Sequence, residues 1–184
     1  MTPVTMAAFV DTLERIAADR LDPRQVQAYL QHTPVAPAAL EPYLVFRPGG
    51  YTRNLVHRTS AFEVLVICWD VGQRAPVHGH EGEFCWARIE RGRLRFTTYR
   101  VESEDPLVVT PTGPPVDAEP PYLDGPADIH AVENPVEFGM PAATLHVYAR
   151  PYDACDVYDL ALGVRKRVTL GYDTIDGQPV APAP

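Results

Sequence analysis

Residues 72–92 contain the stretch that decides the fold, G-Q-R-A-P-V-H-G-H-E-G-E-F-C-W-A-R-I-E-R-G. His78 and His80 lie two residues apart in it, between segments with the composition of strands. Because successive side chains of a strand point to opposite faces, both imidazoles share one face, where a single metal ion can reach them. An isolated H-x-H pair is often just two polar residues on an exposed strand, so the metal site is a hypothesis that needs further ligands.

The spacing from Gly72 through both histidines to Gly92 resembles the first motif of the cupin barrel, G-x5-H-x-H-x3/4-E-x6-G. One position departs from it, because Cys85 replaces the usual ligand glutamate. A third ligand is then needed, and His130 is the best candidate, since H-A-V-E-N resembles the H-x3-N part of the second cupin motif through Asn134. Three neutral imidazoles suit a divalent first-row metal, and on that ground alone iron, zinc, nickel and copper all remain open.

Three further stretches accompany the histidines: Y-T-R-N-L-V at 51–56, I-C-W at 67–69 and L-H-V-Y at 145–148. Together the five motifs resemble the cysteine dioxygenase family, in the family's order, from about residue 51 to 153. This resemblance implies an enzyme with one Fe(II) per chain, which adds both atoms of O2 to the sulfur of L-cysteine and gives cysteine sulfinic acid. It also implies that His78, His80 and His130 are the iron ligands.

The same resemblance assigns roles to residues around the iron. Arg53 matches the arginine that binds the substrate carboxylate, and its planar guanidinium can form two parallel hydrogen bonds with a carboxylate. Tyr51, two residues earlier, is expected to orient that guanidinium or to add its hydroxyl to the pocket. Thr144, His146 and Tyr148 alternate along one strand and match a hydrogen-bonded relay beside the iron, with threonine in place of the family's serine.

Cys85 matches the family cysteine that becomes linked through its sulfur to the tyrosine matched by Tyr148, so a thioether between them is predicted. Two departures from the family pattern stand nearby. Phe84 replaces a polar residue of some relatives and is expected to make that wall of the pocket more apolar. Arg150 follows Ala149 where animal members have a proline after a cis peptide, so a trans peptide or a rearranged turn is expected.

Composition agrees with one soluble domain. A length of 184 residues suits a single domain with an ample core, and the net charge of −8 argues against nonspecific binding to nucleic acid or anionic membranes. The three cysteines lack paired spacing, and no signal sequence or long apolar run is present, which predicts a cytoplasmic protein. A monomer is also expected. Cys68 and Cys155 are interpreted as structural, and His32 and His57 as surface or locally bonded residues.

The pattern along the chain predicts a mainly β fold, a single jelly-roll-like cupin barrel with N-terminal helices packed outside. The expected parts are a helical region at 1–45, the barrel at 50–172 and an extended tail at 173–184. Thr5 could cap a first helix, and Asp22 precedes a second one. Their expected apolar faces comprise Met6, Phe9, Val10, Leu13, Ile16 and Ala17 in the first helix and Val26, Tyr29 and Leu30 in the second. The proline-rich segment from Pro106 to Pro126 is expected to be an irregular loop.

Two other functions remain open from the sequence. One is a thiol dioxygenase for 3-mercaptopropionate or a related thiol, but such relatives tend to carry glutamine where this chain has Arg53. The other is a noncatalytic or regulatory cupin that binds a metal or a small acid. Cys85, His146 and Tyr148 argue against it, because a binding module has little need to assemble them around an open metal.

Overall fold

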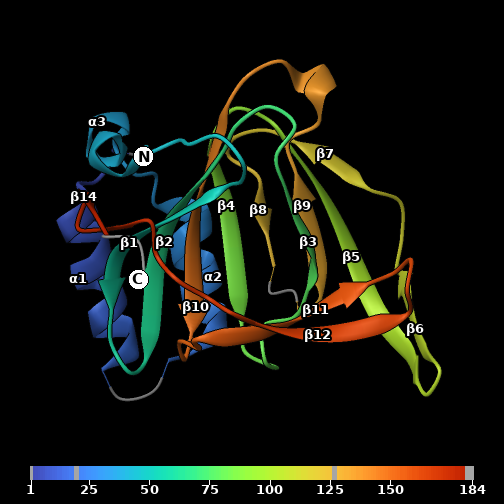
Figure 1. Ribbon diagram of the computed structural model, residues 1–184. Coiled ribbons are helices and arrows are strands. Elements are labelled where there is room, and N and C mark those ends of the chain that lie inside the picture. The colour runs from blue at the N-terminus through green and yellow to red at the C-terminus, as the bar shows by residue number, and fades with distance from the viewer. Residues whose placement is uncertain (1, 19–20, 126–127, 181–184) are drawn as a thin grey trace.

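The computed structural model describes residues 2–18, 21–125 and 128–180 and is mainly β, with helices near the start of the chain (Figure 1). The helices are α1 (Met6–Ala17), α2 (Pro23–His32), α3 (Pro37–Leu40) and the 3-10 helices η1 (Glu41–Tyr43) and η2 (Val136–Phe138). Among the described helices, none has the length and apolar character needed to span a bilayer.

The strands form two sheets of seven strands. The first has the order β14-β13-β1-β2-β10-β4-β8, with the bounds Gln178–Pro179, Thr174–Ile175, Thr52–Arg58, Phe62–Trp69, Ala142–Ala149, Cys85–Arg91 and Leu123–Asp124. The second has the order β12-β11-β3-β9-β5-β6, with the bounds Val164–Thr169, Ala154–Asp159, Arg74–His78, His130–Glu133, Leu94–Glu104 and Leu107–Pro111, and β7 (Val116–Ala118) pairs with β5. The predicted mainly β, jelly-roll-like fold is confirmed. The sheets nevertheless form a two-layered sandwich and do not close into a barrel, because among the described strands no ladder joins the edges of one sheet to those of the other.

Strand β2 shows why the first sheet is buried on both faces. Its sequence F-E-V-L-V-I-C-W is buried at every position. Val64 and Val66 belong to a core between this sheet and the helices, whereas Leu65 and Ile67 belong to a core between the two sheets. Since side chains of a strand alternate between faces, one continuous apolar run supplies both cores.

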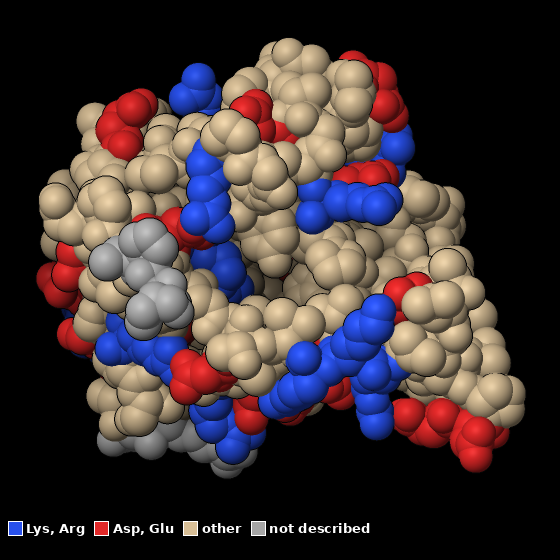
Figure 2. All heavy atoms as spheres, in the orientation of Figure 1, with Lys and Arg blue, Asp and Glu red and all other residues tan. Residues whose placement is uncertain are grey.

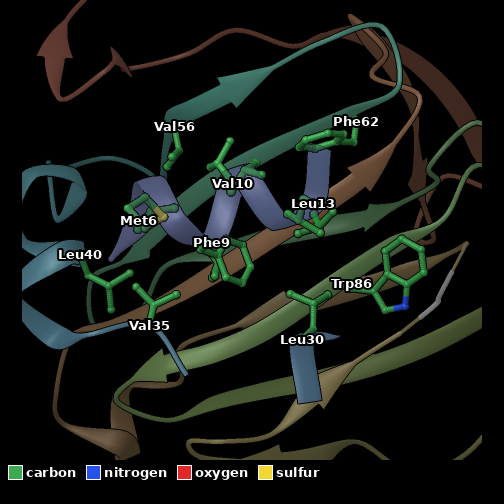
Figure 3. Close-up of a cluster of buried hydrophobic side chains, with 14 of the residues drawn as sticks. Met6, Phe9, Val10, Leu13, Leu30, Val35, Leu40, Val56, Phe62 and Trp86 are labelled. Atoms are coloured by element: carbon green, nitrogen blue, oxygen red, sulfur yellow. The ribbon is translucent and has the colours of Figure 1, made fainter. Parts of the chain in front are cut away.

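The two predicted helices begin close to their predicted starts, and each has a side-chain cap. Thr5 Oγ1 accepts a hydrogen bond from the Ala8 amide at 3.2 Å, and Asp22 Oδ1 accepts one from the Arg24 amide at 2.9 Å. Such caps satisfy amides that have no partner inside the helix. Figure 3 shows the resulting core, in which Phe9 of α1 and Leu30 of α2 pack toward the sheet.

Arg88 of strand β4 forms hydrogen bonds with the backbone at the end of α2. Its Nη1 donates to the carbonyl oxygens of Leu30, at 2.5 Å, and Thr33, at 2.7 Å, and its Nε donates to Glu90 at 2.5 Å. The side chain is buried, and the helix carbonyls would otherwise lack these donors. We expect Arg88→Met to lower the free energy of unfolding by about 3 kcal/mol, because it leaves the largely buried Glu90 carboxylate and the carbonyls at the end of α2 unpaired.

Arg100 offers a matched control for this prediction. It forms the same ion pair with a carboxylate two residues later, Nε to Glu102 Oε1 at 2.6 Å, but on the exposed surface. Arg100→Met is expected to change the stability by less than about 1 kcal/mol. Urea unfolding of both variants measures the difference, and equal losses would show that the contacts of Arg88 with α2 contribute nothing.

The segment from Pro106 to Pro126 corrects one prediction from the sequence. It is not irregular throughout, since it contains β6, β7 and β8, although Pro126 lies outside the described residues. Pro111 ends β6, the edge strand of its sheet, where a missing backbone N–H is tolerated. The domain boundaries stay a prediction. Two short strands, β13 and β14, lie inside the predicted tail; they pair with each other, and β13 also pairs with β1.

Candidate metal centre and its pocket

The three histidines predicted to bind metal lie together between the sheets. His78 ends β3, His80 follows it after one glycine, and His130 begins β9 opposite His78 in the antiparallel ladder. Their ring centroids form a nearly equilateral triangle with sides of 5.0, 4.9 and 4.8 Å. Their ligand nitrogens all lie within 4.8 Å of one another.

Backbone carbonyls fix the tautomers of two of these histidines. Nδ1 of His78 lies 2.8 Å from the carbonyl oxygen of Pro76, and Nδ1 of His80 lies 2.6 Å from that of Asp128. Because a carbonyl oxygen can only accept, Nδ1 carries the proton in both rings and Nε2 has a free lone pair. Nε2 of His80 is buried and has no partner among the described residues.

The third histidine is held differently. Nδ1 of His130 lies 3.0 Å from Oδ2 of Asp124, a buried residue of β8, so it too presents Nε2 to the common centre. Sequence analysis missed Asp124, because its segment was expected to be a loop. An acidic residue six positions before a candidate ligand was the available signal, and it is a weak one.

These nitrogens are suited to a metal ion. Burial, together with the neighbouring His130, lowers the pKa of His78 to about 3, and the same causes lower the pKa of His80 well below its ordinary value. Both rings are therefore neutral near pH 7. Three imidazole nitrogens, one of them a buried atom to which the described part of the chain offers no partner, fit a divalent first-row metal.

A chain of hydrogen bonds runs along β10 beside the histidines. Trp69 Nε1 donates to Thr144 Oγ1 at 3.1 Å, Thr144 Oγ1 lies 2.8 Å from His146 Nε2, and His146 Nδ1 lies 3.0 Å from the Tyr148 hydroxyl. Burial lowers the pKa of His146 well below its ordinary value and raises that of Tyr148 well above its own. The imidazole is thus neutral, and the phenol keeps its proton. Trp69 was quoted within a motif but had no predicted role.

Arg53, on β1 of the first sheet, lies beside Tyr148. Its Nε donates to the carbonyl oxygen of Gly171 at 3.1 Å, and its Nη2 lies 3.5 Å from Oε1 of the buried Glu63. Burial opposes its charge, but the nearby Glu63 carboxylate favours it, and the pKa of Arg53 lies above its ordinary value. Within the described part of the chain, its Nη1 bonds no protein acceptor. Tyr51 precedes β1 and stacks on Trp69 with ring centroids 4.7 Å apart.

Cys85 and Tyr148 face each other directly. They are register partners in the antiparallel ladder between β4 and β10. Directly opposed residues have Cβ atoms about 4.5–5.5 Å apart, which is within reach of a shared side-chain bond. Burial raises the pKa of the Cys85 thiol well above its ordinary value, so the group is a neutral thiol in this environment.

A cavity of about 220 Å³ connects these groups. It is lined by Tyr51, Arg53, Pro76, His78, Tyr148, Tyr152, Cys155, Val157, Val168 and Leu170. Figure 2 shows the molecule hollowed near the middle of one face, with basic side chains gathered along β12 beside the hollow. The residues from β11 and β12, and Leu170 just after β12, were missed by sequence analysis, because their alternation shows a strand but not what it faces.

Of the remaining predicted residues, Cys155 lines the cavity and the others lie outside it. Phe84 points to the opposite face from its neighbour Cys85, where it is 42% exposed and stacks on Trp86. It does not line the cavity, so the prediction that Phe84 makes one wall of the pocket more apolar is wrong. The Ala149–Arg150 peptide is trans, which agrees with the expectation, and Arg150 has a left-handed φ of 53°. The remaining histidines that were set aside lie elsewhere: His32 is exposed at the end of α2, and Nε2 of His57 lies 3.1 Å from Oε1 of Glu14. Cys68 and Cys155 are buried free thiols.

Comparison with known proteins places the chain in a family. Residues 1–161 match the family model described as cysteine dioxygenase type I. The chain belongs to this family. It is 28% identical over 176 residues to cysteine dioxygenase type 1 of Rattus norvegicus, with 94% of this chain and 88% of the rat protein covered. The Homo sapiens protein is 26% identical over the same length and coverage. Membership of the cysteine dioxygenase family makes the chain an oxidoreductase of the dioxygenase class.

Solved structures similar to this cysteine dioxygenase family member include two bacterial proteins. A cupin superfamily protein from Desulfitobacterium hafniense has a TM-score of 0.46 and 14% identity, covering 65% of this chain and 93% of its own. An uncharacterized conserved protein with a double-stranded β-helix domain from Klebsiella pneumoniae has a TM-score of 0.44 and 17% identity, covering 65% and 94%.

Proposed function

We propose that the protein is an Fe(II)-dependent cysteine dioxygenase, which adds both atoms of O2 to the sulfur of L-cysteine. The observation that carries this proposal is the shared cavity, which is lined by a candidate metal ligand, His78, by the guanidinium of Arg53 and by the phenol of Tyr148. Its volume of about 220 Å³ lies below the roughly 300–1,000 Å³ of pockets for drug-sized ligands, which favours a substrate as small as one amino acid.

Arg53 would bind the substrate carboxylate. Its Nε and Nη2 are occupied by Gly171 and Glu63, which fix the plane of the guanidinium, and its Nη1 can donate to an anion in the cavity. Charge-assisted hydrogen bonds of this kind are about twice as strong as neutral ones. Holding the carboxylate sets the distance between the substrate sulfur and the three histidines.

The relay of β10 would control one proton at Tyr148. Since Trp69 donates to Thr144, the Thr144 hydroxyl can donate to Nε2 of His146, and Nδ1–H can then donate to the Tyr148 oxygen. In that arrangement the phenol proton is free to point into the cavity. In the other arrangement the phenol donates to Nδ1, so a change of the His146 tautomer switches the proton of Tyr148 between relay and substrate.

His78, His80 and His130 would hold the iron through Nε2. When bound, Fe(II) would supply coordination of the substrate thiolate and activation of O2, while the substrate sulfur provides all four electrons. The surrounding aromatic and aliphatic side chains of the cavity restrict water near the reacting groups. Tyr51, packed against Trp69, would keep the wall beside Arg53 rigid.

A thioether between Cys85 and Tyr148 is part of the proposal, supported by their direct opposition in the sheet. Its formation joins Sγ to a ring carbon and removes two hydrogen atoms, with dioxygen as the oxidant. We expect turned-over protein to contain a species lighter by two hydrogens, visible by intact mass, and a crosslinked peptide. Cys155→Ser should keep this species, although Cys155 also lines the cavity, and Cys85→Ser should lose it. Unmodified Cys85 throughout active protein would refute the crosslink.

Anaerobic reconstitution with Fe(II), followed by O2 uptake and sulfinate measurements, tests the function. L-cysteine and 3-mercaptopropionate are compared in parallel, because both present a thiol and a carboxylate and only cysteine has an amine. Faster coupled turnover of cysteine is expected. Preference for 3-mercaptopropionate would reassign the substrate within the thiol dioxygenases, and no turnover of either thiol by iron-loaded protein would favour a noncatalytic metal-binding cupin.

A further inference from the structure

The three site histidines are held by different kinds of acceptor. The Nδ1 atoms of His78 and His80 meet backbone carbonyls, whereas that of His130 meets the carboxylate of Asp124 at 3.0 Å. Any of these acceptors orients a ring and fixes its tautomer. A carboxylate also polarises the N–H bond and makes the opposite nitrogen a stronger donor to a metal.

Apart from His130, no described group contacts the Asp124 carboxylate with a charge that could compensate it. The residue is 8% exposed, and its second contact is the Tyr122 hydroxyl, at 3.4 Å from Oδ1. In the described part of the chain, no lysine or arginine forms a salt bridge with it, whereas the buried Glu63 is paired with both Arg53 and Arg58. A buried carboxylate needs a compensating positive charge, and a divalent ion behind the His130 ring would supply it.

The backbone around Asp124 is held in place. Asp124 pairs with Ala87 of β4, and Gly125 follows it with a φ of 111°. A Cβ at Gly125 would lie 2.3 Å from the carbonyl oxygen of Cys85, so only glycine allows β8 to approach β4 this closely. The carboxylate is thus positioned by the same strand that carries Cys85, which stands where the cupin motif has its ligand glutamate.

We propose that Asp124 is a positioning residue of the metal centre that supplies, through His130, the negative charge missing from the set of ligands. Three neutral imidazoles leave both charges of a divalent ion uncompensated in a pocket that also holds Arg53. A carboxylate that is hydrogen-bonded to a metal ligand offsets part of that charge without occupying a coordination position. The inference rests on the metal site of the proposed function.

Direct measurement of Fe(II) affinity tests this proposal. The metal-free wild type and the Asp124→Asn and Asp124→Ala variants compete anaerobically for Fe(II) with a coloured chelator. Asparagine retains an oxygen that can accept from Nδ1 and removes only the charge, so Asp124→Asn should weaken binding by about tenfold or more and raise the Fe(III)/Fe(II) reduction potential. Asp124→Ala should lose at least as much affinity. Asp159→Asn, which removes one charge near Lys166 on the surface, is the control and should bind like the wild type.

The outcomes separate this inference from the proposed function. Wild-type affinity and potential in Asp124→Asn, with weakening only in Asp124→Ala, would show that Asp124 merely orients His130 and would overturn the role of its charge. Equal affinity in all variants would overturn the inference altogether and leave the iron site intact. A wild type that binds no Fe(II) would refute the proposed function, and the inference with it. Thermal unfolding of the metal-free variants shows whether they are folded. If Asp124→Asn is not, the Fe(III)/Fe(II) reduction potential of Asp124→Ala serves as the test, and a wild-type potential there would overturn the role of the charge.

Discussion

His130→Ala is expected to lose both iron and thiol oxidation. Nε2 of His130 is one of three converging nitrogens, and no other described histidine, cysteine or carboxylate groups with His78 and His80 to replace it. Mutation of residues that hydrogen-bond to a metal ligand already weakens metal affinity by about 10–100-fold. Loss of a direct ligand should therefore weaken Fe(II) affinity by more than about 100-fold. Iron content after reconstitution and gel filtration, measured beside O2 uptake, gives the result.

His32→Ala is the matched control for this variant. His32 is exposed at the end of α2 and makes no contact with the cluster, so its iron content and activity should equal those of the wild type. Full iron content in His130→Ala would move the third ligand elsewhere. Loss of iron with an unfolded protein would be uninformative, and the thermal midpoint of metal-free His130→Ala guards against that reading.

The sequence predicted those parts of the molecule that local pattern determines. The faces of α1 and α2 follow from apolar periodicity, and their starts follow from Thr5 and Asp22, whose side chains act over only a few residues. The two histidine motifs predicted a cluster because strand pairing brings the end of β3 opposite the start of β9. The helix features depend on local spacing, which a single sequence displays, and the cluster was predicted from the spacing within the two histidine motifs.

What the sequence did not predict depends on contacts between distant segments. Asp124 is recognisable as a partner of His130 only after β8 has paired with β4, and prolines around it concealed the strand. Glu63 lies in an apolar run, and its role follows only from the arginines that pack against it from β1. The open sandwich in place of a closed barrel likewise depends on how sheet edges end, which local alternation does not specify.

Arg53→Ala is expected to raise KM for L-cysteine steeply and to lower kcat, with kcat/KM falling by about 100-fold or more, or about 3 kcal/mol of transition-state stabilisation. The reason is twofold, because the substrate carboxylate loses its charged donor and Glu63 loses one of its two arginine partners. Arg53→Lys should recover only part of the loss, since an ammonium group cannot bond Gly171, Glu63 and the substrate in one plane. Steady-state kinetics with cysteine measure the series.

Two comparisons assign that loss to carboxylate recognition. Arg58 lies on the same strand and also pairs with Glu63, at 3.4 Å, but does not line the cavity, so Arg58→Ala should lower kcat/KM by less than about tenfold if direct contact matters more than general positive charge. Cysteamine, which has the thiol and amine of cysteine without the carboxylate, should be oxidised slowly by the wild type and almost equally slowly by Arg53→Ala. If Arg53→Ala slows cysteamine and cysteine by the same factor, the guanidinium acts on the metal centre or the fold and not on the carboxylate, because a substrate without that group cannot lose a contact it never made.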